Sequence, residues 1–215
     1  MTLGEIKTYV AGLVDDPQMT YFGTTLLTTF ANHAQGEVQK LLIQAGQNYY
    51  ITGHTFASVA YQQGYSLPAN FLKLNRLEYI TGTAPNDSVY PIGSITMNQQ
   101  DNFQRYANYP AAFYFSQYQV QLVPIPDSVQ SFRMQYTYRV ADMTSDSDTP
   151  NIPIQYQTYL AYLMAIQCFI KDSRDPGTLL SYTSKIEEEI KRDAVERAQD
   201  RAPSVVQTFN DEYYW

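Results

Sequence analysis

The side chains that usually carry chemistry are few in this chain and lie far apart in the sequence. Among 215 residues there are two histidines, His33 and His54, and one cysteine, Cys168. A zinc site takes about four ligands at short characteristic spacings, and neither histidine has such a set around it. The sequence also lacks a glycine-rich phosphate loop, a nucleophile elbow and a His-Glu-x-x-His motif. We therefore expect no metal site and no cofactor.

Carboxylates are the remaining candidates for chemistry. Asp142, Asp146 and Asp148 share one polar segment, as calcium ligands do. The glycine of an EF-hand loop is missing, however, and Pro153 stands at the twelfth position, where that loop needs a glutamate. Residues 187–189 are consecutive glutamates, which fan around a helix and so cannot flank one bond as glycosidase carboxylates do. We predict no catalytic residue and no enzymatic activity.

The composition favours contacts between proteins. The chain contains 20 tyrosines, and tyrosine offers a large apolar ring together with a hydroxyl group, which suits interfaces. The net charge is −7 and the pI is about 4.7, whereas proteins that grip nucleic acid carry a basic surface. An acidic surface can still border DNA that must slide past without adhering.

The hydropathy pattern indicates neither an export signal nor a membrane-spanning segment. The first five residues have no basic region followed by an apolar one, so we expect no signal peptide. The longest apolar run, 154–170, is short for a membrane span and contains three glutamines, which favours a buried helix. Cys168 lies in this run and is expected to be a small buried side chain rather than a reactive thiol.

Residues 1–48 have the pattern of two helices. A capping-box spacing begins at Thr2, and apolar residues follow at intervals of three and four up to an Asp-Asp-Pro sequence. A second apolar stripe of helical period begins at Thr24 or Thr25 and ends near Gly46. We expect these two helices to form an antiparallel pair.

Residues 49–140 change to the pattern of strands. Short apolar or alternating stretches are separated by Gly, Pro and Asn at intervals too small for long helices. A short helix is expected near 96–106. The segments that we expect to be strands are 56–61, 72–81, 112–116, 118–123 and 131–139.

Residues 141–201 return to a helical pattern. After a polar loop, Pro153 can begin a helix whose apolar residues cover nearly its whole circumference up to Ile170, which predicts the most buried element. Asp175 and Pro176 suit the start of a last helix. One face of that helix is apolar, and the other carries acid-first charge pairs at a spacing of four, typical of a solvated face.

These segments predict an α+β protein. Its helices are expected to form an antiparallel bundle of an N-terminal pair and two C-terminal helices. A central β-rich insertion separates the two pairs in the sequence, and an extended C-terminal arm follows the last helix. The expected divisions are 1–48 and 141–201 for the bundle, 49–140 for the insertion and 202–215 for the arm.

The arm ends in an aromatic cluster. Phe209, Tyr213, Tyr214 and Trp215 stand where chain termini are usually polar. Because tyrosine and tryptophan dominate interface hot spots, we expect these side chains to bind a neighbouring subunit or another partner. The alternative is that the arm folds back onto its own domain.

The order of several short motifs resembles that of tailed-phage head-to-tail connector proteins, also described as adaptor, neck or tail tubular proteins. The sequence Tyr-Ser-Leu-Pro-Ala-Asn-Phe at 65–71 resembles the family's Y-x-L-P-x-D-F element, with Asn70 where aspartate is common. The likeness covers most of residues 1–200. Its other segments are 3–6, 26–38, 109–115, 120–126, 136–139 and 152–156.

The resemblance implies a structural virion protein in the neck between head and tail, made in the host cytoplasm. Such proteins form a homo-oligomeric ring, usually of about twelve copies, beneath the portal protein. The ring extends the channel through which double-stranded DNA passes without sequence-specific binding, and it offers a docking platform to a tail or nozzle protein. The family's C-terminal segment often embraces the portal or the next subunit, which suits the aromatic arm. Candidate channel-facing residues are Glu187, Glu188, Lys191 and Arg192.

One alternative function is a carbohydrate- or receptor-binding module that uses a tyrosine-rich β surface. Coplanar, solvent-facing rings in a groove would favour this alternative, whereas buried rings would favour the adaptor. An enzyme with carboxylates brought together from distant positions is a third hypothesis. The tyrosines that discriminate are Tyr79, Tyr90, Tyr109, Tyr114, Tyr118 and Tyr138.

Overall fold

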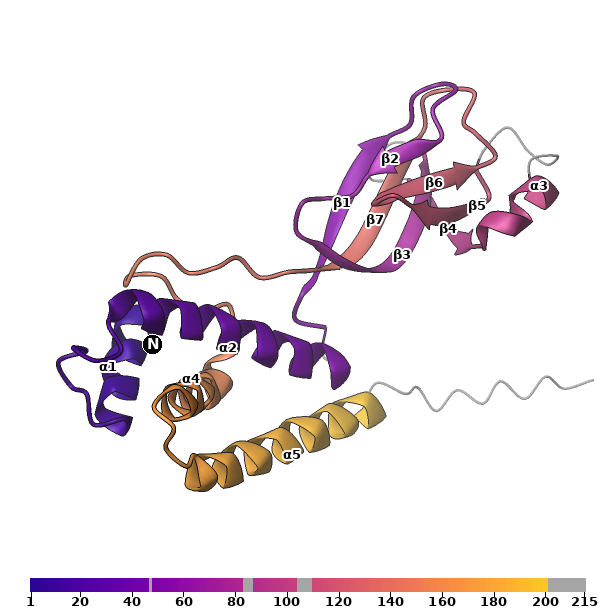
Figure 1. Ribbon diagram of the computed structural model, residues 1–215. Helices are drawn as coiled ribbons and strands as arrows, with labels where there is room; N and C mark the ends of the chain where they lie inside the picture. The colour runs from indigo at the N-terminus through magenta and orange to yellow at the C-terminus, as the bar shows by residue number, and fades with distance from the viewer. Residues whose placement is uncertain (47, 83–86, 104–109, 201–215) are drawn as a thin grey trace, which may run out of the picture. The chain divides into compact units, whose positions relative to one another are not determined.

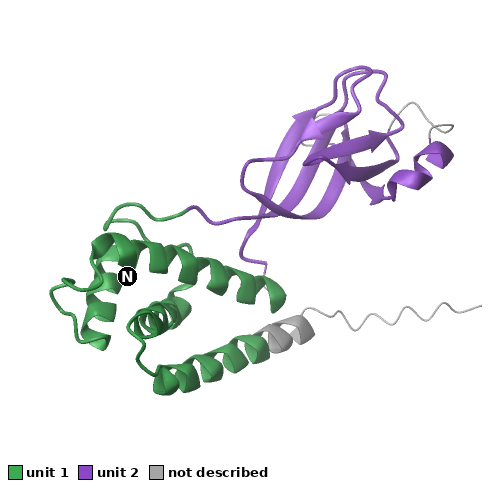
Figure 2. Ribbon diagram, in the orientation of Figure 1, with its two compact units in different colours: residues 1–47, 142–215 green, residues 48–141 purple. Residues whose placement is uncertain are grey.

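The computed structural model describes residues 1–46, 48–82, 87–103 and 110–200, the last seven of these as helix backbone alone. Internal contacts divide the chain into two compact units (Figure 2). The helical unit comprises the described residues of 1–47 and 142–215, and the β unit comprises those of 48–141. The chain therefore passes from the helical unit into the β unit and returns.

The helical unit is built around one apolar helix. The helices are α1 (Leu3–Leu13), α2 (Thr24–Gln44), α4 (Gln157–Lys171) with a 3₁₀ turn before it (Ile154–Tyr156), and α5 (Gly177–Asp200). Leu160, Met164 and Cys168 of α4 are fully buried. This helix packs against α1, α2 and α5, and a larger share of its residues is buried than in α1 or α2, as its apolar sequence predicts.

The expected antiparallel bundle is wrong. In Figure 1, α4 is seen end-on between α2 and α5, which both run across the view, so α4 crosses its neighbours steeply. The helix α1 likewise crosses α2. Its contact with α4 is more extensive than its contact with α2. Apolar periodicity identifies the face that a helix buries but not its crossing angle, which depends on how side-chain ridges fit together. The β-rich part is a curled seven-stranded sheet.

The connection between α1 and α2 shows why these helices do not form a simple hairpin. The Asp16 carboxylate accepts hydrogen bonds from the backbone N–H groups of Thr20, Tyr21 and Phe22 at 3.0 Å each. These bonds fix an ordered loop that carries the chain around the end of the unit and buries Phe22. At the other end of α1, Thr2 and Glu5 form the expected capping box.

The β unit is a single curled sheet in the order β1-β7-β3-β4-β5-β6-β2. All neighbouring strands are antiparallel except β4 and β5, which are parallel. A 3₁₀ turn (Met97–Gln99) and the short α3 (Gln100–Phe103) follow β4. The strands are β1 (Ile51–Ala57), β2 (Gly64–Ser66), β3 (Phe71–Thr81), β4 (Ser88–Ser94), β5 (Ala112–Ser116), β6 (Gln119–Val123) and β7 (Ser131–Tyr138).

Eight of the described tyrosines and phenylalanines of this unit belong to one apolar cluster on the sheet. Phe132, Met134 and Tyr136 alternate along β7 and are buried, as the pattern of that strand predicts. The ring of Phe132 lies 5.5 Å from that of Phe56 and 5.6 Å from that of Tyr79. Many aromatic residues of this part of the chain therefore form its core.

Four expected strands are present with ends within two residues of the prediction, and one is misplaced. The strand expected at 56–61 is β1, Ile51–Ala57, and the chain turns away at Ser58. Gly53 interrupts the strand pattern of Ile-Thr-Gly-His-Thr, and pairing with β7 overrides this weak local preference. The Pro91-containing β4 was missed for the same reason.

Candidate interaction surfaces

The described residues bring no reactive side chains together. No group of three or more His, Cys, Asp or Glu side chains among them is arranged to hold a metal ion. The His33 ring nitrogen Nδ1 lies 3.0 Å from the Gln167 amide, and His54 is exposed on β1. Cys168 is fully buried, and burial raises the pKa of its thiol to about 11, so it is not poised as a nucleophile.

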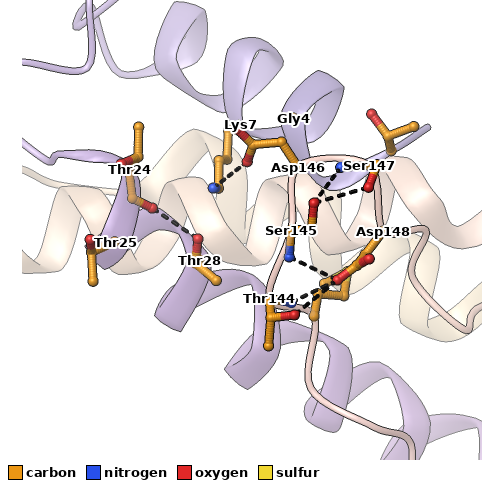
Figure 3. A network of polar contacts seen from close by, with 12 residues as sticks. Gly4, Lys7, Thr24, Thr25, Thr28, Thr144, Ser145, Asp146, Ser147 and Asp148 are labelled. Carbon is orange, nitrogen blue, oxygen red and sulfur yellow. Dashed lines mark hydrogen bonds and ion pairs between the residues drawn. The ribbon is translucent and has the colours of Figure 1, made fainter.

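Asp146 and Asp148 hold a polypeptide loop in place (Figure 3). The Asp148 carboxylate accepts hydrogen bonds from the backbone N–H groups of Thr144 and Ser145, both at 2.8 Å. These bonds lower the pKa of Asp148. The Asp146 carboxylate lies 2.6 Å from the ammonium of Lys7, whose side chain is only 6% exposed. The loop is thereby fixed to α1.

The same loop satisfies the free N–H groups at the start of α1. Leu3 donates to the Asp148 carbonyl at 2.7 Å and Gly4 to the Asp146 carbonyl at 3.0 Å. From α2, the Asn32 amide donates to the Met143 carbonyl and accepts from the Met143 N–H. The segment that returns from the β unit is thus anchored at several points.

An open polar groove of about 390 Å³ lies beside this loop. Thr24, Thr25, Thr28 and Thr29 line it from the first turns of α2, and the first three of these are labelled in Figure 3. The Thr28 and Thr29 hydroxyls donate to the carbonyls of residues 24 and 25, and Lys7 is paired with Asp146. The Thr28 and Thr29 hydroxyls and the Lys7 ammonium are therefore engaged within the helical unit.

A continuous group of tyrosines spans three helices of the helical unit. Tyr9 of α1 is hydrogen-bonded to Tyr162 of α4, which raises the pKa of Tyr162. The ring of Tyr162 lies 6.2 Å from that of Tyr182 of α5, and the Lys185 ammonium lies 5.9 Å from the Tyr182 ring centroid. Tyr9 and Tyr182 are exposed. We call Tyr9, Tyr162 and Tyr182 the tyrosine face.

Two loops at one end of the β unit expose large apolar side chains. The loops are 58–63, after β1, and 124–130, after β6; they run together in Figure 1. Tyr61 is 83% exposed and Val129 is 75% exposed, and Val59 and Ile125 are also exposed. We call these four side chains the apolar tip.

The backbone beneath the apolar tip is held by hydrogen bonds between the two loops. Buried Ser58 donates its N–H to the Gln130 carbonyl at 2.7 Å, and its hydroxyl accepts from the Gln130 N–H at 2.8 Å. The Tyr61 N–H donates to the Pro126 carbonyl at 2.8 Å. Tyr61 has φ of 66°, an unfavourable conformation for a bulky residue. Because hydrogen bonds already fix the backbone of both loops, they lose little conformational entropy when a partner binds.

The charged residues expected to face a channel lie on α5. Glu188, Lys191 and Arg192 are exposed, whereas Glu187 is half-buried and accepts a hydrogen bond from the Tyr159 hydroxyl at 2.8 Å. Glu187 thus differs from the other three because it joins α5 to α4. The expected partner-binding residues, Phe209, Tyr213, Tyr214 and Trp215, lie outside the described residues.

The tyrosines that discriminate between adaptor and sugar-binding module are in different environments. Tyr114 is buried, Tyr79 and Tyr138 are half-buried, and Tyr90 and Tyr118 are exposed. Tyr109 lies outside the described residues. Tyr79 and Tyr90 have ring centroids 6.5 Å apart with planes inclined by 32°. The described members of the set do not form a groove of coplanar exposed rings.

Sequence reasoning missed both exposed apolar groups. The tyrosine face joins three helices whose packing was not foreseen. The apolar tip combines loops about 70 residues apart, although one signal for it was present: Ile125 and Val129 are apolar residues in a segment that is otherwise turn-like.

None of the described helices has the length and apolarity required to cross a membrane. A comparison with curated proteins finds no match. The family model described as SU10 adaptor protein matches residues 1–208, nearly the whole chain. This match agrees with the order of motifs in the sequence. The chain belongs to the SU10 adaptor protein family, a family of phage head-to-tail adaptors.

Proposed function

We propose that this protein is a structural component of the virion neck, where about twelve copies form a closed ring beneath the portal protein. The ring extends the channel for double-stranded DNA and offers a docking platform to a tail or nozzle protein. Family membership supports the adaptor role. No step of this role requires catalysis.

One observation carries the proposal most directly: each unit exposes its own group of apolar or aromatic side chains. The helical unit exposes the tyrosine face, and the β unit exposes the apolar tip. An adaptor must contact several proteins at once, and a closed ring needs two different complementary patches on each subunit. Separate surfaces on separate units allow the chain to contact different proteins, whereas a single-ligand module needs only one surface.

We assign the helical unit to the ring and the β unit to the tail. The tyrosine face joins α1, α4 and α5 and so presents a surface that is supported by the core of the helical unit. The two loops that carry the apolar tip, 58–63 and 124–130, are joined by hydrogen bonds and contain a single charged residue, Asp127. It suits a complementary apolar surface on the tail or nozzle protein.

The exposed charges of α5 suit a DNA channel. Glu188 introduces a negative charge beside Lys191 and Arg192, and the chain as a whole has a net charge of −7. Neutralising contacts to phosphates would hold DNA in place, whereas a mixed or acidic wall allows it to slide. In this proposal, the arm at 202–215 uses its aromatic residues to anchor the subunit.

Mixing the purified chain with the portal ring tests the proposal. Native mass spectrometry should detect a complex of one portal ring with about twelve copies of the chain, and the tyrosine-face variant Tyr182→Ser should bind fewer copies. The matched control is Tyr90→Ser, which removes an exposed tyrosine from the β unit. A chain that stays monomeric beside the portal would contradict the proposal.

A further inference from the structure

The first strand of the β unit has a free edge. Among the described residues, β1 lies at one end of the sheet and pairs with β7 alone. The other end of the sheet is β2, which has only three residues. By contrast, β1 has seven residues, of which five are exposed. The sheet therefore has one long edge that another strand can pair with.

The register shows which groups this edge presents. The Tyr138 N–H donates to the Tyr50 carbonyl at 2.9 Å, and the Ser58 N–H donates to the Gln130 carbonyl at 2.7 Å. Hydrogen-bonded and non-hydrogen-bonded positions alternate in an antiparallel pair. The even-numbered residues between them consequently point their backbone groups toward β7. The residues whose N–H and C=O groups point outward are Ile51, Gly53, Thr55 and Ala57.

This edge lacks the features that usually prevent strand addition. Exposed edge strands are commonly protected by lysine, proline, a bulge or very short length. The sequence Ile-Thr-Gly-His-Thr-Phe-Ala has no lysine, no other formal charge at neutral pH and no proline, and its pairing with β7 is in continuous register. A Cβ atom at Gly53 would meet nothing within 4 Å. The edge is thus open for pairing.

A segment of matching length and chemistry lies near the end of the chain. Residues 204–209 read Ser-Val-Val-Gln-Thr-Phe, an uncharged sequence of six residues with four that favour strands. Pro203 precedes it and prevents a helix from continuing through it. Asp211 and Glu212 follow, which limits the apolar stretch. The segment is preceded by the last described helix, α5, which ends at Asp200.

We infer that residues 204–209 of one copy add as a strand to the β1 edge of a neighbouring copy. This inference rests on the proposed ring, which brings a second copy alongside. Strand addition draws its affinity from main-chain hydrogen bonds, and alternate side chains give specificity. Because the arm and the edge are different surfaces, the contact runs in one direction from copy to copy and closes with the ring.

Hydrogen exchange in the full-length chain tests the inference. The amides of Gly53 and Thr55 point outward, so they should exchange freely in dilute protein. In the ring assembled on the portal, these two amides should exchange at about one tenth of that rate or at a lower rate. The double variant Val205→Pro with Val206→Pro should abolish this protection, because one of two adjacent residues must supply an N–H to the ladder. Asp211→Pro with Glu212→Pro is the matched control and should retain it.

The outcomes separate this inference from the proposed function. Equal exchange in ring and dilute protein, or protection that survives the Val205 and Val206 prolines, would overturn strand addition while leaving portal binding intact. Protection already present in dilute monomer would show that the arm pairs with its own chain, which also overturns it. If no ring forms on the portal, a concentration series of the chain alone decides: protection that rises with concentration supports the inference, and its absence refutes it.

Discussion

Single carboxylates with several hydrogen bonds hold parts of this protein together. Asp16 accepts bonds from three backbone N–H groups and from the Thr20 hydroxyl. The hydrogen bond from the Phe22 N–H is the largest cause that lowers the pKa of Asp16 from its ordinary value of 3.8. Asp16 therefore links the stability of the helical unit to pH.

Asp16→Asn should lower the free energy of unfolding of the helical unit at neutral pH. A group whose pKa is lowered by folding stabilises the folded state above its unfolded pKa, and this contribution disappears as the pH falls through the folded pKa. The difference between wild type and variant should consequently shrink below pH 3.8. Urea denaturation at several pH values measures it. Asp15→Asn, an exposed neighbour, should show no comparable loss, and an equal loss would contradict this role of Asp16.

Glu78 has a corresponding role within the sheet. Its carboxylate is 2% exposed and lies 2.7 Å from the Arg76 guanidinium and 2.6 Å from that of Arg133. Glu78→Gln should destabilise the β unit by about 1.5–3 kcal/mol, the usual value of hydrogen bonds to charged groups. The exposed Glu37, 3.7 Å from Lys40, provides a control: Glu37→Gln should cost no more than about 0.5 kcal/mol. Denaturation curves that rank the two variants in the opposite order would refute the assignment.

At the scale of elements, the sequence predicts which segments are regular better than how they pack. The capping box at Thr2, the start of α2 at Thr24 and the strand ending at Thr81 are all local signals, and the structure agrees with them. The crossing of α4 between α2 and α5 depends on the fit of side chains from three helices, which no local window contains. The prediction of an antiparallel bundle was wrong for that reason.

The candidate surfaces were predictable only where one segment forms them. The charges of α5 follow from helical spacing alone, so their placement on the exposed side of that helix was accessible from sequence, apart from the bond between Glu187 and Tyr159. The apolar tip needs the pairing of Ser58 with Gln130, which joins two loops that are distant in the chain. A contact of this kind leaves no periodic trace in either segment.

The apolar tip yields a prediction with a close control. Tyr61→Asn should reduce attachment of the tail or nozzle protein. It should change the free energy of unfolding by less than about 0.5 kcal/mol, because the Tyr61 side chain contacts mainly solvent. Tyr118→Asn is matched, since Tyr118 is 92% exposed and has φ of 59°, yet lies in the β5–β6 turn. Asparagine tolerates such φ values. Complementation of tail-less particles measures the effect, and equal attachment by both variants would exclude the tip as the docking site.

At the scale of the whole molecule, an adaptor is defined by the number of partners that it holds together. This chain has two units with separate cores, two groups of exposed aromatic or apolar side chains, and a strand edge without protecting charges. The return loop that carries Asp146 and Asp148 fixes the chain to the helical unit after it leaves the β unit. Such an arrangement allows each unit to meet a different neighbour.

Cryo-electron microscopy of the capsid vertex in the intact particle tests the ring most directly. We predict density for a closed ring of this chain immediately beneath the portal, with the β units toward the tail and α5 bordering the channel. Density at that position that fits neither the helical unit nor the β unit, in particles shown to contain the protein, would contradict the adaptor ring.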